Sequence, residues 1–473
     1  MKKLLALLLA AVLTVAMFGC AAKPAEKEEG SESGYALAEA LMPDLPQKPS
    51  WDDYQKKFDE LASKNLGDEE RTEQEDALYD EYETAQNAYD EALQALRGSG
   101  VETDAGFAAF TDKLAASVLD PEENSVLSPV NLYLALSMLT ELTDGETRQQ
   151  VLDLLGSKDT AALRDTCRSI WENLYLDDGE SKTLLANAVF LNKGFRHEDA
   201  PLETLAKDYY ADSYQLPMGT AEADKAVQDW LNDHTGKLLE DSVKNLETDP
   251  QTALMLASAL YFKGAWLEKF EESATAEDTF YAADGSEQTA DFMHLSQNQS
   301  VVRGDGFTAA TLDFREQGGM TFLLPDEGVS LDSLVQSGAL QAALQTDESG
   351  DSEAEVHWSV PKFDAEATMQ LKDVLQALGV TDVFDPDAAD FTPLTGGADG
   401  DPLYVSSVEH AARVKVDETG CEAAAYTVIT VDAAALDPDD LPVVEMNLNR
   451  PFLFVITGVD GLPLFVGAVN TMQ

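Results

Sequence analysis

Apolar positions are spaced differently in the two halves of the chain. Up to about Leu246 they recur mostly three or four residues apart, which is the spacing of amphipathic helices. Beyond that point, short runs of β-branched and aromatic residues become frequent, as in Thr321–Leu324, Val356–Val360, Val414–Val416 and Phe452–Ile456. Helices gathered early and strands gathered late predict an α+β fold rather than alternating βαβ units.

The same pattern divides the chain into parts. Gly98-Ser99-Gly100 precedes one large mixed domain, which we predict to cover residues 99–473. Residues 51–98 form an acidic helical N-terminal extension with apolar residues at helical spacing. We expect its aromatic stripe to pack on the main domain, and a partner-binding helical hairpin is the alternative. Residues 21–50 are rich in Ala, Pro, Glu, Lys and Ser, which predicts a flexible tether.

The first twenty residues have the layout of a secretory signal. Lys2 and Lys3 precede an unbroken apolar run, Leu4–Phe18, that is short for a membrane span. Cys20 follows a small residue at the end of this run and resembles the lipidated Cys of a bacterial lipobox, although the residues before it depart from that motif. We therefore expect a lipoprotein signal peptide over residues 1–20, lipidation of Cys20, and a protein anchored to the outer face of a bacterial cell membrane. An ordinary signal peptide with an incidental cysteine is the alternative.

The amino-acid composition of the chain argues against several classes of function. The chain has 31 Lys plus Arg against 88 Asp plus Glu, a formal net charge of −57. Such a surface repels nucleic acid and anionic lipid, so we expect no nucleic-acid partner and membrane contact only through the lipid anchor. Three cysteines and five scattered histidines predict neither a disulfide framework nor a metal site. No hydrolase elbow, zinc-protease, redox or P-loop motif occurs, so we expect no cofactor and no enzymatic activity.

One late segment has the pattern of a half-buried strand where a loop would be expected. After the turn-like Asp417–Gly420, residues 421–436 contain no Gly and no Pro. Sorted by a period of two, the residues fall into one set without charge and another that holds both acids. The uncharged set is Cys421, Ala423, Ala425, Thr427, Ile429 and Val431, and the other is Glu422, Ala424, Tyr426, Val428, Thr430 and Asp432.

Fragments in a fixed order over residues 101–473 resemble the serpin family of serine protease inhibitors. Each fragment is short, and the specificity comes from so many in order across most of the chain. They include Ser128-Pro129, Ala186–Phe190, Leu260–Trp266, Leu323–Glu327, Val360–Phe363, Val383–Asp387, Asn449–Phe454 and Phe465–Gly467. The resemblance implies helices packed around a large central β-sheet, further sheets and an exposed reactive-centre loop.

The resemblance also implies roles for particular residues. It places the reactive-centre loop at about residues 418–442 and a shutter region at Ser128, Pro129, Asn187 and His410. Small side chains at the start of the loop let it enter the main sheet as an extra strand. This implied hinge is Glu418, Thr419, Gly420, Cys421, Glu422, Ala423, Ala424 and Ala425.

Counting fourteen residues on from Gly420, as the family pattern does, places the scissile bond at Ala434-Ala435. A small residue before the cut suits an elastase-like or subtilisin-like serine protease as the partner of a monomeric inhibitor. The segment that follows is longer than the usual pattern, so cleavage after Ala433, Ala435 or Leu436 stays open.

Other functions remain possible at this stage. A serpin-fold surface lipoprotein without inhibitory activity, whose loop is only a protease substrate, is the main alternative. A solute-binding lipoprotein would account for the signal and the tether but not for the ordered fragments. Cys421 stands where the family mostly has Thr or another small residue, and its oxidation would obstruct the hinge.

Overall fold

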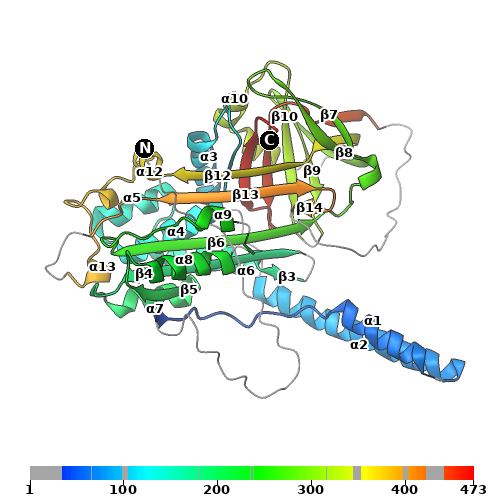
Figure 1. Cartoon of the computed structure of the whole chain (residues 1–473), viewed down its shortest axis with the longest axis horizontal. Coiled ribbons are helices and arrows are strands. Elements are labelled where there is room, and N and C mark those ends of the chain that lie inside the picture. The colour runs from blue at the N-terminus through cyan, green and yellow to red at the C-terminus, as the bar shows by residue number, and fades with distance from the viewer. Residues whose placement is uncertain are drawn as a thin grey trace.

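The computed structural model describes residues 35–64, 66–97, 105–178, 181–234, 236–237, 239–315, 317–344, 353–397, 403–421 and 441–472. Two large β-sheets and the helices around them make up the body (Figure 1). The α+β prediction is confirmed. Cys20 and residues 422–440, with the predicted scissile bond, lie outside the described residues.

The described helices precede, flank and interrupt the sheets. Among them, none combines the length and the apolar content needed to cross a bilayer. The α-helices are α1 (Trp51–Ser63), α2 (Asp68–Arg97), α3 (Ala105–Val118), α4 (Pro129–Leu142), α5 (Gly145–Leu155), α6 (Thr160–Leu174), α7 (Asp199–Asp208), α8 (Ala221–Asp233), α9 (Glu240–Val243), α10 (Leu331–Gln336), α11 (Ala339–Ala343), α12 (Lys372–Ala377) and α13 (Thr392–Thr395). Two 3₁₀ turns are η1 (Glu272–Ala274) and η2 (Asp382–Phe384).

The central sheet has the strand order β1-β5-β4-β6-β14-β13-β12, and β3 pairs with β4. Its long strands are well separated in sequence, so the sheet joins distant parts of the chain. Its strands are β1 (Ala36–Ala38), β3 (Leu176–Asp177), β4 (Lys182–Asn192), β5 (Ala211–Leu216), β6 (Leu254–Ala265), β12 (Phe363–Gln370), β13 (Glu409–Asp417) and β14 (Gly420–Cys421).

The second sheet has the order β15-β11-β8-β9-β10-β16-β17-β2, and β7 pairs with β8. Its inner strands β10, β16 and β17 are buried along their whole length, which explains their unbroken apolar runs. Its strands are β2 (Ser125–Leu127), β7 (Ala276–Tyr281), β8 (Glu287–Gly304), β9 (Phe307–Asp313), β10 (Gly319–Pro325), β11 (Glu353–Pro361), β15 (Val443–Asn447), β16 (Phe452–Thr457) and β17 (Pro463–Val469).

Helices cover both faces of the central sheet. On one face, α4 is buried throughout and belongs to the main hydrophobic core, and Pro129 at its first position suits a helix start. On the other face, α8 turns Val227, Trp230 and Leu231 onto the sheet and forms a second, smaller core. Thr220 caps α8 by accepting a hydrogen bond from the Ala223 N–H, 3.3 Å away.

Part of the predicted tether belongs to the body. Strand β1 pairs with β5 at the edge of the central sheet, so residues 36–38 extend the sheet by one short strand. Further along, the Leu41 N–H donates to the Ala206 carbonyl at 2.8 Å, and Lys48 forms an ion pair with the buried Asp178 at 3.1 Å. Backbone pairing of this kind needs no apolar pattern, which is why the composition of residues 35–50 suggested a tether.

The stripe of the N-terminal extension packs on the main domain only at its C-terminal end, through Tyr89, Leu93 and Leu96, whereas its earlier aromatic residues close a helical hairpin. The expected packing is therefore found for part of the stripe. Trp51 and Tyr54 of α1 lie edge-on against Tyr82 of α2, with ring centroids 5.0 and 5.1 Å apart. Only the end of α2 docks on the body, where Tyr89 is buried and Arg97 donates to the Tyr175 carbonyl. The two helices thus pack against each other through these rings, although Trp51 stays exposed, and the hairpin extends away from the sheets (Figure 1).

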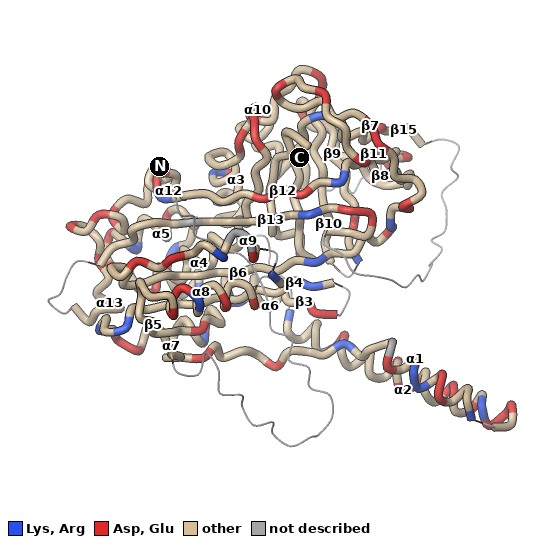
Figure 2. The backbone as a smooth tube through the Cα atoms, in the orientation of Figure 1, with Lys and Arg blue, Asp and Glu red and all other residues tan. Residues whose placement is uncertain are grey.

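Acidic residues are spread over the whole molecule. Figure 2 shows them on both sheets, on the surrounding helices and on the hairpin, not in a single patch. The charge therefore acts as a general repulsion toward anions and does not define a local site.

Candidate functional site

The central sheet contains a slot between β6 and β13. These strands are joined only through the two residues of β14, which pair with Ala265 and Gly264 on one side and with Asp417 and Val416 on the other. In the part of the chain that the structure describes, no backbone pairing links β6 to β13 directly. Beyond β14, the facing backbone edges of the two strands could therefore pair with a further strand that continued from β14.

β14 consists of the predicted hinge residues Gly420 and Cys421. A Cβ atom at position 420 would lie 2.1 Å from the carbonyl oxygen of Gly264, so only glycine fits there. Cys421 is 4% exposed and belongs to the main core, as its place in the uncharged set predicts. The chain thus already enters the slot at this end.

Polar contacts fix the residues just before β14. The Glu418 carboxylate accepts hydrogen bonds from Thr275 at 2.9 Å and from Lys362 at 3.2 Å. Trp266 donates its backbone N–H to the Thr419 carbonyl, and its indole N–H donates to the carbonyl of residue 417. Burial alone would raise the pKa of Glu418, but the hydrogen bonds to its own backbone N–H, Thr275 and Lys362 outweigh burial and lower it.

Glu418→Gln is expected to lower the melting temperature of the uncleaved protein by about 1–3 °C at neutral pH, the effect of losing about 1–2 kcal/mol in a chain of this length. Because the folded pKa is lowered, the carboxylate stabilises the fold above its unfolded pKa, and this contribution is lost as the pH falls. The difference between wild type and variant should therefore shrink below about pH 4.5. Melting curves at several pH values measure it, with exposed Glu287→Gln as the control. An equal shift at all pH values would contradict this role.

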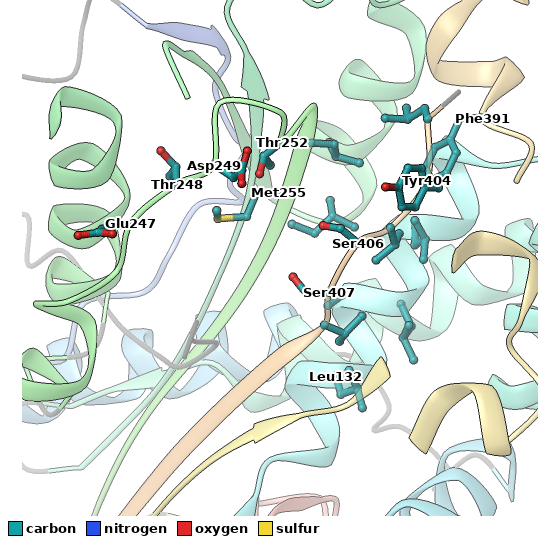
Figure 3. A pocket seen from close by; sticks show the side chains of 18 residues that line it. Leu132, Glu247, Thr248, Asp249, Thr252, Met255, Phe391, Tyr404, Ser406 and Ser407 are labelled. Atoms are coloured by element: carbon teal, nitrogen blue, oxygen red, sulfur yellow. The ribbon is translucent and has the colours of Figure 1, made fainter. Parts of the chain in front are cut away.

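A cavity of about 380 Å³ lies at the opposite end of the slot (Figure 3). It opens between the start of β6 and the segment that leads into β13, and α4 forms its floor. Apolar side chains such as Leu132 and Phe391 line it, whereas Ser406 and Ser407 line it from the segment before β13. A strand that continued from β14 would reach this cavity at its far end.

Buried polar residues lie beneath the middle of the slot. The Ser128 N–H donates to Nε2 of His410 at 2.9 Å, while Asn187 donates to the Tyr209 carbonyl at 2.8 Å. Burial lowers the pKa of His410 to about 4, so its imidazole is neutral at physiological pH. Within the described residues, the Ser258 hydroxyl, Nδ1 of His410 and the amide oxygen of Asn187 are buried and have no hydrogen-bond partner. A buried polar atom without a partner costs about 1–3 kcal/mol, so a group that entered the slot and bonded to Ser258 or His410 would be favoured.

The structure places the predicted site residues only in part. It brings Ser128 and His410 into contact, starts α4 at Pro129, and places residues 418–421 at the entrance to the slot. Glu422, Ala423, Ala424 and Ala425 lie outside the described residues, as do Ala434 and Ala435. Sequence reasoning did not single out Thr275 or the contact between Lys362 and Glu418, because these residues are far apart in the chain and no local pattern joins them.

Comparisons with known proteins agree with this geometry. The family model described as "Serpin (serine protease inhibitor)" matches residues 105–472. Serpin-Z2B of Triticum aestivum is 31% identical over 376 residues, covering 76% of this chain and 94% of the relative. The native state of the thermophilic serpin tengpin matches with a TM-score of 0.69 at 27% identity, covering 79% of this chain and 96% of that one. Arabidopsis AtSerpin1 in its native stressed conformation matches with a TM-score of 0.66 at 26% identity, covering 79% of this chain and 100% of that one.

Matches over most of the chain, in sequence and in fold, identify the family. The chain belongs to the serpin family. Family membership implies protease inhibition in general, and it confirms the fold expected from the ordered fragments.

Proposed function

We propose that this protein is a suicide-type inhibitor that covalently traps serine proteases of the elastase-like or subtilisin-like kind. We further propose that it is a monomer held on the outer face of a bacterial cell membrane through a lipid on Cys20. The observation that carries the inhibitory part is the slot between β6 and β13, which β14 has already entered. The anchor rests on the apolar run Leu4–Phe18 and the cysteine that ends it.

The register of β14 specifies how the loop would fill the slot. Each further residue of the loop moves one residue back along β6 and along β13. Ala423 would then lie between Phe262 and Val414, both buried in the main core. The six uncharged residues identified in the sequence would all face this core. Cys421 is already buried, so at about 1–2 kcal/mol for each side chain the other five supply about 5–10 kcal/mol, on the order of 10 kcal/mol.

The same register suggests neighbours for two polar side chains of the loop's first half, Thr427 and Tyr426. Thr427 would come between Ser258 and His410. In the described structure the Ser258 hydroxyl and Nδ1 of His410 have no hydrogen-bond partner, whereas Nε2 of His410 accepts the Ser128 N–H. Tyr426, on the other face, would lie between Ala259 and Ala411, where small side chains leave room for it. These alanines lie in the smaller core beside α8, so Tyr426 would pack against that helix.

Trapping follows from the order of two steps. The protease serine oxygen attacks the carbonyl carbon of residue 434, an ester forms, and the peptide bond to residue 435 breaks, leaving a new amine on Ala435. The freed end, still esterified to the protease, would then travel toward the cavity at the far end of the slot. A gain on the order of 10 kcal/mol rivals the stability of a typical domain, so it can distort the protease before water hydrolyses the ester.

The preferred protease depends on the residue before the cut. Ala434 is small and uncharged, so it suits a shallow specificity pocket and not the pocket of a trypsin-like enzyme. Cleavage after Ala433 or Ala435 would keep this preference, whereas cleavage after Leu436 would favour a chymotrypsin-like enzyme.

Denaturing gels of the protein mixed with pancreatic elastase, and separately with subtilisin, test the proposal. We expect a denaturant-resistant band at the summed mass, and none with a protease whose active-site serine has been blocked. Mass spectrometry of the released C-terminal fragment locates the cut. Clean cleavage without the band, with these and with trypsin-like enzymes, would favour a serpin-fold surface protein whose loop is only a substrate.

A further inference from the structure

Strand β15 directly follows the loop and holds its C-terminal end. It is a five-residue edge strand that pairs, in the described structure, with β11 alone and in parallel. Val443, its first residue, is 54% exposed, whereas Met446 is fully buried. The strand is therefore attached by its backbone ladder, by its two inward apolar residues, Val444 and Met446, and by the contacts of its outward side chains.

One outward contact joins β15 to β11 across the strands. His357 on β11 lies opposite Glu445 on β15. Its Nδ1 is 3.0 Å from Glu445 Oε1, and its Nε2 is 3.2 Å from Glu355 Oε1. Carboxylates accept hydrogen bonds and donate none, so both ring nitrogens can be satisfied only when the imidazole carries two protons. We call these three residues the His357 clip.

The surroundings of the clip favour the charged imidazole. A surface groove of about 450 Å³ at this position is also lined by Asp278 of β7 and His294 of β8. Both glutamates of the clip raise the pKa of His357, Glu355 being the larger influence. Losing the proton removes one of the two carboxylate contacts, and Glu355 and Glu445 are then left as like charges on neighbouring strands.

Release of β15 determines whether the uncleaved loop can enter the slot. In the register of β14, Ala434 would reach the far end of the slot, about 40 Å along the twelve residues of β6. β15 lies toward the β14 end of the molecule (Figure 1). The nine residue-to-residue steps from Ala434 to Val443 span at most about 31 Å. The uncleaved loop can therefore insert fully only after β15 leaves β11.

We infer that the His357 clip is a proton-dependent latch. While His357 is protonated, the clip keeps β15 on the sheet and so preserves the active form. When His357 loses its proton, β15 is held less tightly and the active form is lost faster. The link to activity rests on the proposed function, whereas the latch itself concerns only β15. The pKa of His357 is raised in the folded protein, so the clip stabilises the attachment of β15 at lower pH. This stabilisation is lost as the pH rises through the folded pKa of His357. Because the clip is exposed, loss of the proton should change the equilibrium between attached and detached β15 by only about two- to fivefold.

Hydrogen exchange of the full chain, followed by mass spectrometry of the peptide covering residues 443–448, tests the latch. At about pH 6, His357→Gln should exchange about two- to fivefold faster than wild type in this peptide, and at about pH 9 the two proteins should exchange alike. His294→Gln, which removes a histidine from the same groove, is the matched control and should match wild type at both pH values. Equal exchange of His357→Gln and wild type at about pH 6 would overturn the latch.

A second measurement separates the latch from the proposed function. Spontaneous loss of trapping activity during incubation should be about two- to fivefold faster at about pH 9 than at about pH 6 for wild type and equally fast at both for His357→Gln. If wild type traps no protease at all, the proposed function fails, but the exchange result still decides on the latch. If exchange behaves as expected and the loss of activity does not depend on His357, the link between β15 and insertion is wrong.

Discussion

Ala425→Glu is expected to convert the protein from an inhibitor into a substrate of the same protease. In the register of β14, residue 425 would lie between Leu260 and Ala412, which are 3% and 1% exposed and face the core. A glutamate there would have to enter the sheet as an unpaired buried charge, which costs several kcal/mol. Each 1.4 kcal/mol changes the partition between insertion and ester hydrolysis about tenfold, so trapping should fall at least tenfold.

Ala424→Glu is the matched control because it makes the same chemical change one residue away. In the same register, residue 424 would lie between Tyr261 and Arg413 on the other face of the sheet. Arg413 is partly exposed and already pairs with Asp364 at 2.7 Å, so an added glutamate would meet a cation and solvent. We expect its stoichiometry of inhibition to stay within about twofold of wild type.

The measurement is the number of inhibitor molecules consumed for each protease molecule trapped, with the protease that forms the denaturant-resistant band. Loss of trapping in Ala425→Glu alone supports insertion in the register of β14. Loss in Ala424→Glu alone would mean that the loop enters with the opposite face inward. Unimpaired trapping in both variants would contradict insertion between β6 and β13.

The alternation of side chains predicted more of the site than any motif did. Cys421 falls in the uncharged set by its position alone, and it is the residue of that set that the structure describes, buried against the core. The α+β class also followed from spacing, because helices and strands bury one face at different periods. Such patterns report which face of an element is buried, and they succeed wherever burial alone decides the structure.

The features of the structure that the sequence did not predict depend on which strands and side chains pair, not on which residues are buried. β6 and β13 alternate like any other strands of a sheet, so nothing in them indicates that they are not neighbours. Strand β1 attaches through backbone hydrogen bonds and leaves no apolar pattern in residues 36–38. The contact between Glu418 and Lys362 joins residues 56 positions apart through a fold that must exist first.

Acidification from about pH 6.5 to about pH 4 is expected to destabilise the uncleaved protein through His410. This side chain is 1% exposed, and its Nε2 accepts the Ser128 N–H, so the neutral imidazole carries its proton on Nδ1. A second proton would place a charge in the core and set an N–H against the Ser128 N–H. Burial accordingly lowers the folded pKa to about 4, against about 6.5 when unfolded.

The sign of this effect follows from the lowered pKa. The contribution of neutral His410 to the free energy of unfolding is fully present above about pH 6.5. It is lost as the pH falls toward about 4, and the total loss amounts to about 3 kcal/mol. Burial also lowers the pKa of His234, which adds to the loss, whereas the raised pKa of His357 acts in the opposite direction. The informative quantity is therefore the difference between wild type and a variant of His410 alone.

His410→Gln is the variant that isolates this titration, because the glutamine oxygen can still accept the Ser128 N–H. It should be less stable than wild type at neutral pH, since the smaller side chain leaves space beneath the slot. Between about pH 6.5 and about pH 4.5, however, it should lose about 2–3 kcal/mol less than wild type does. Chemical denaturation at these pH values measures it, and the exposed His294→Gln should follow wild type. If wild type and His410→Gln lose equal stability on acidification, protonation of His410 does not limit the acid stability of the sheet.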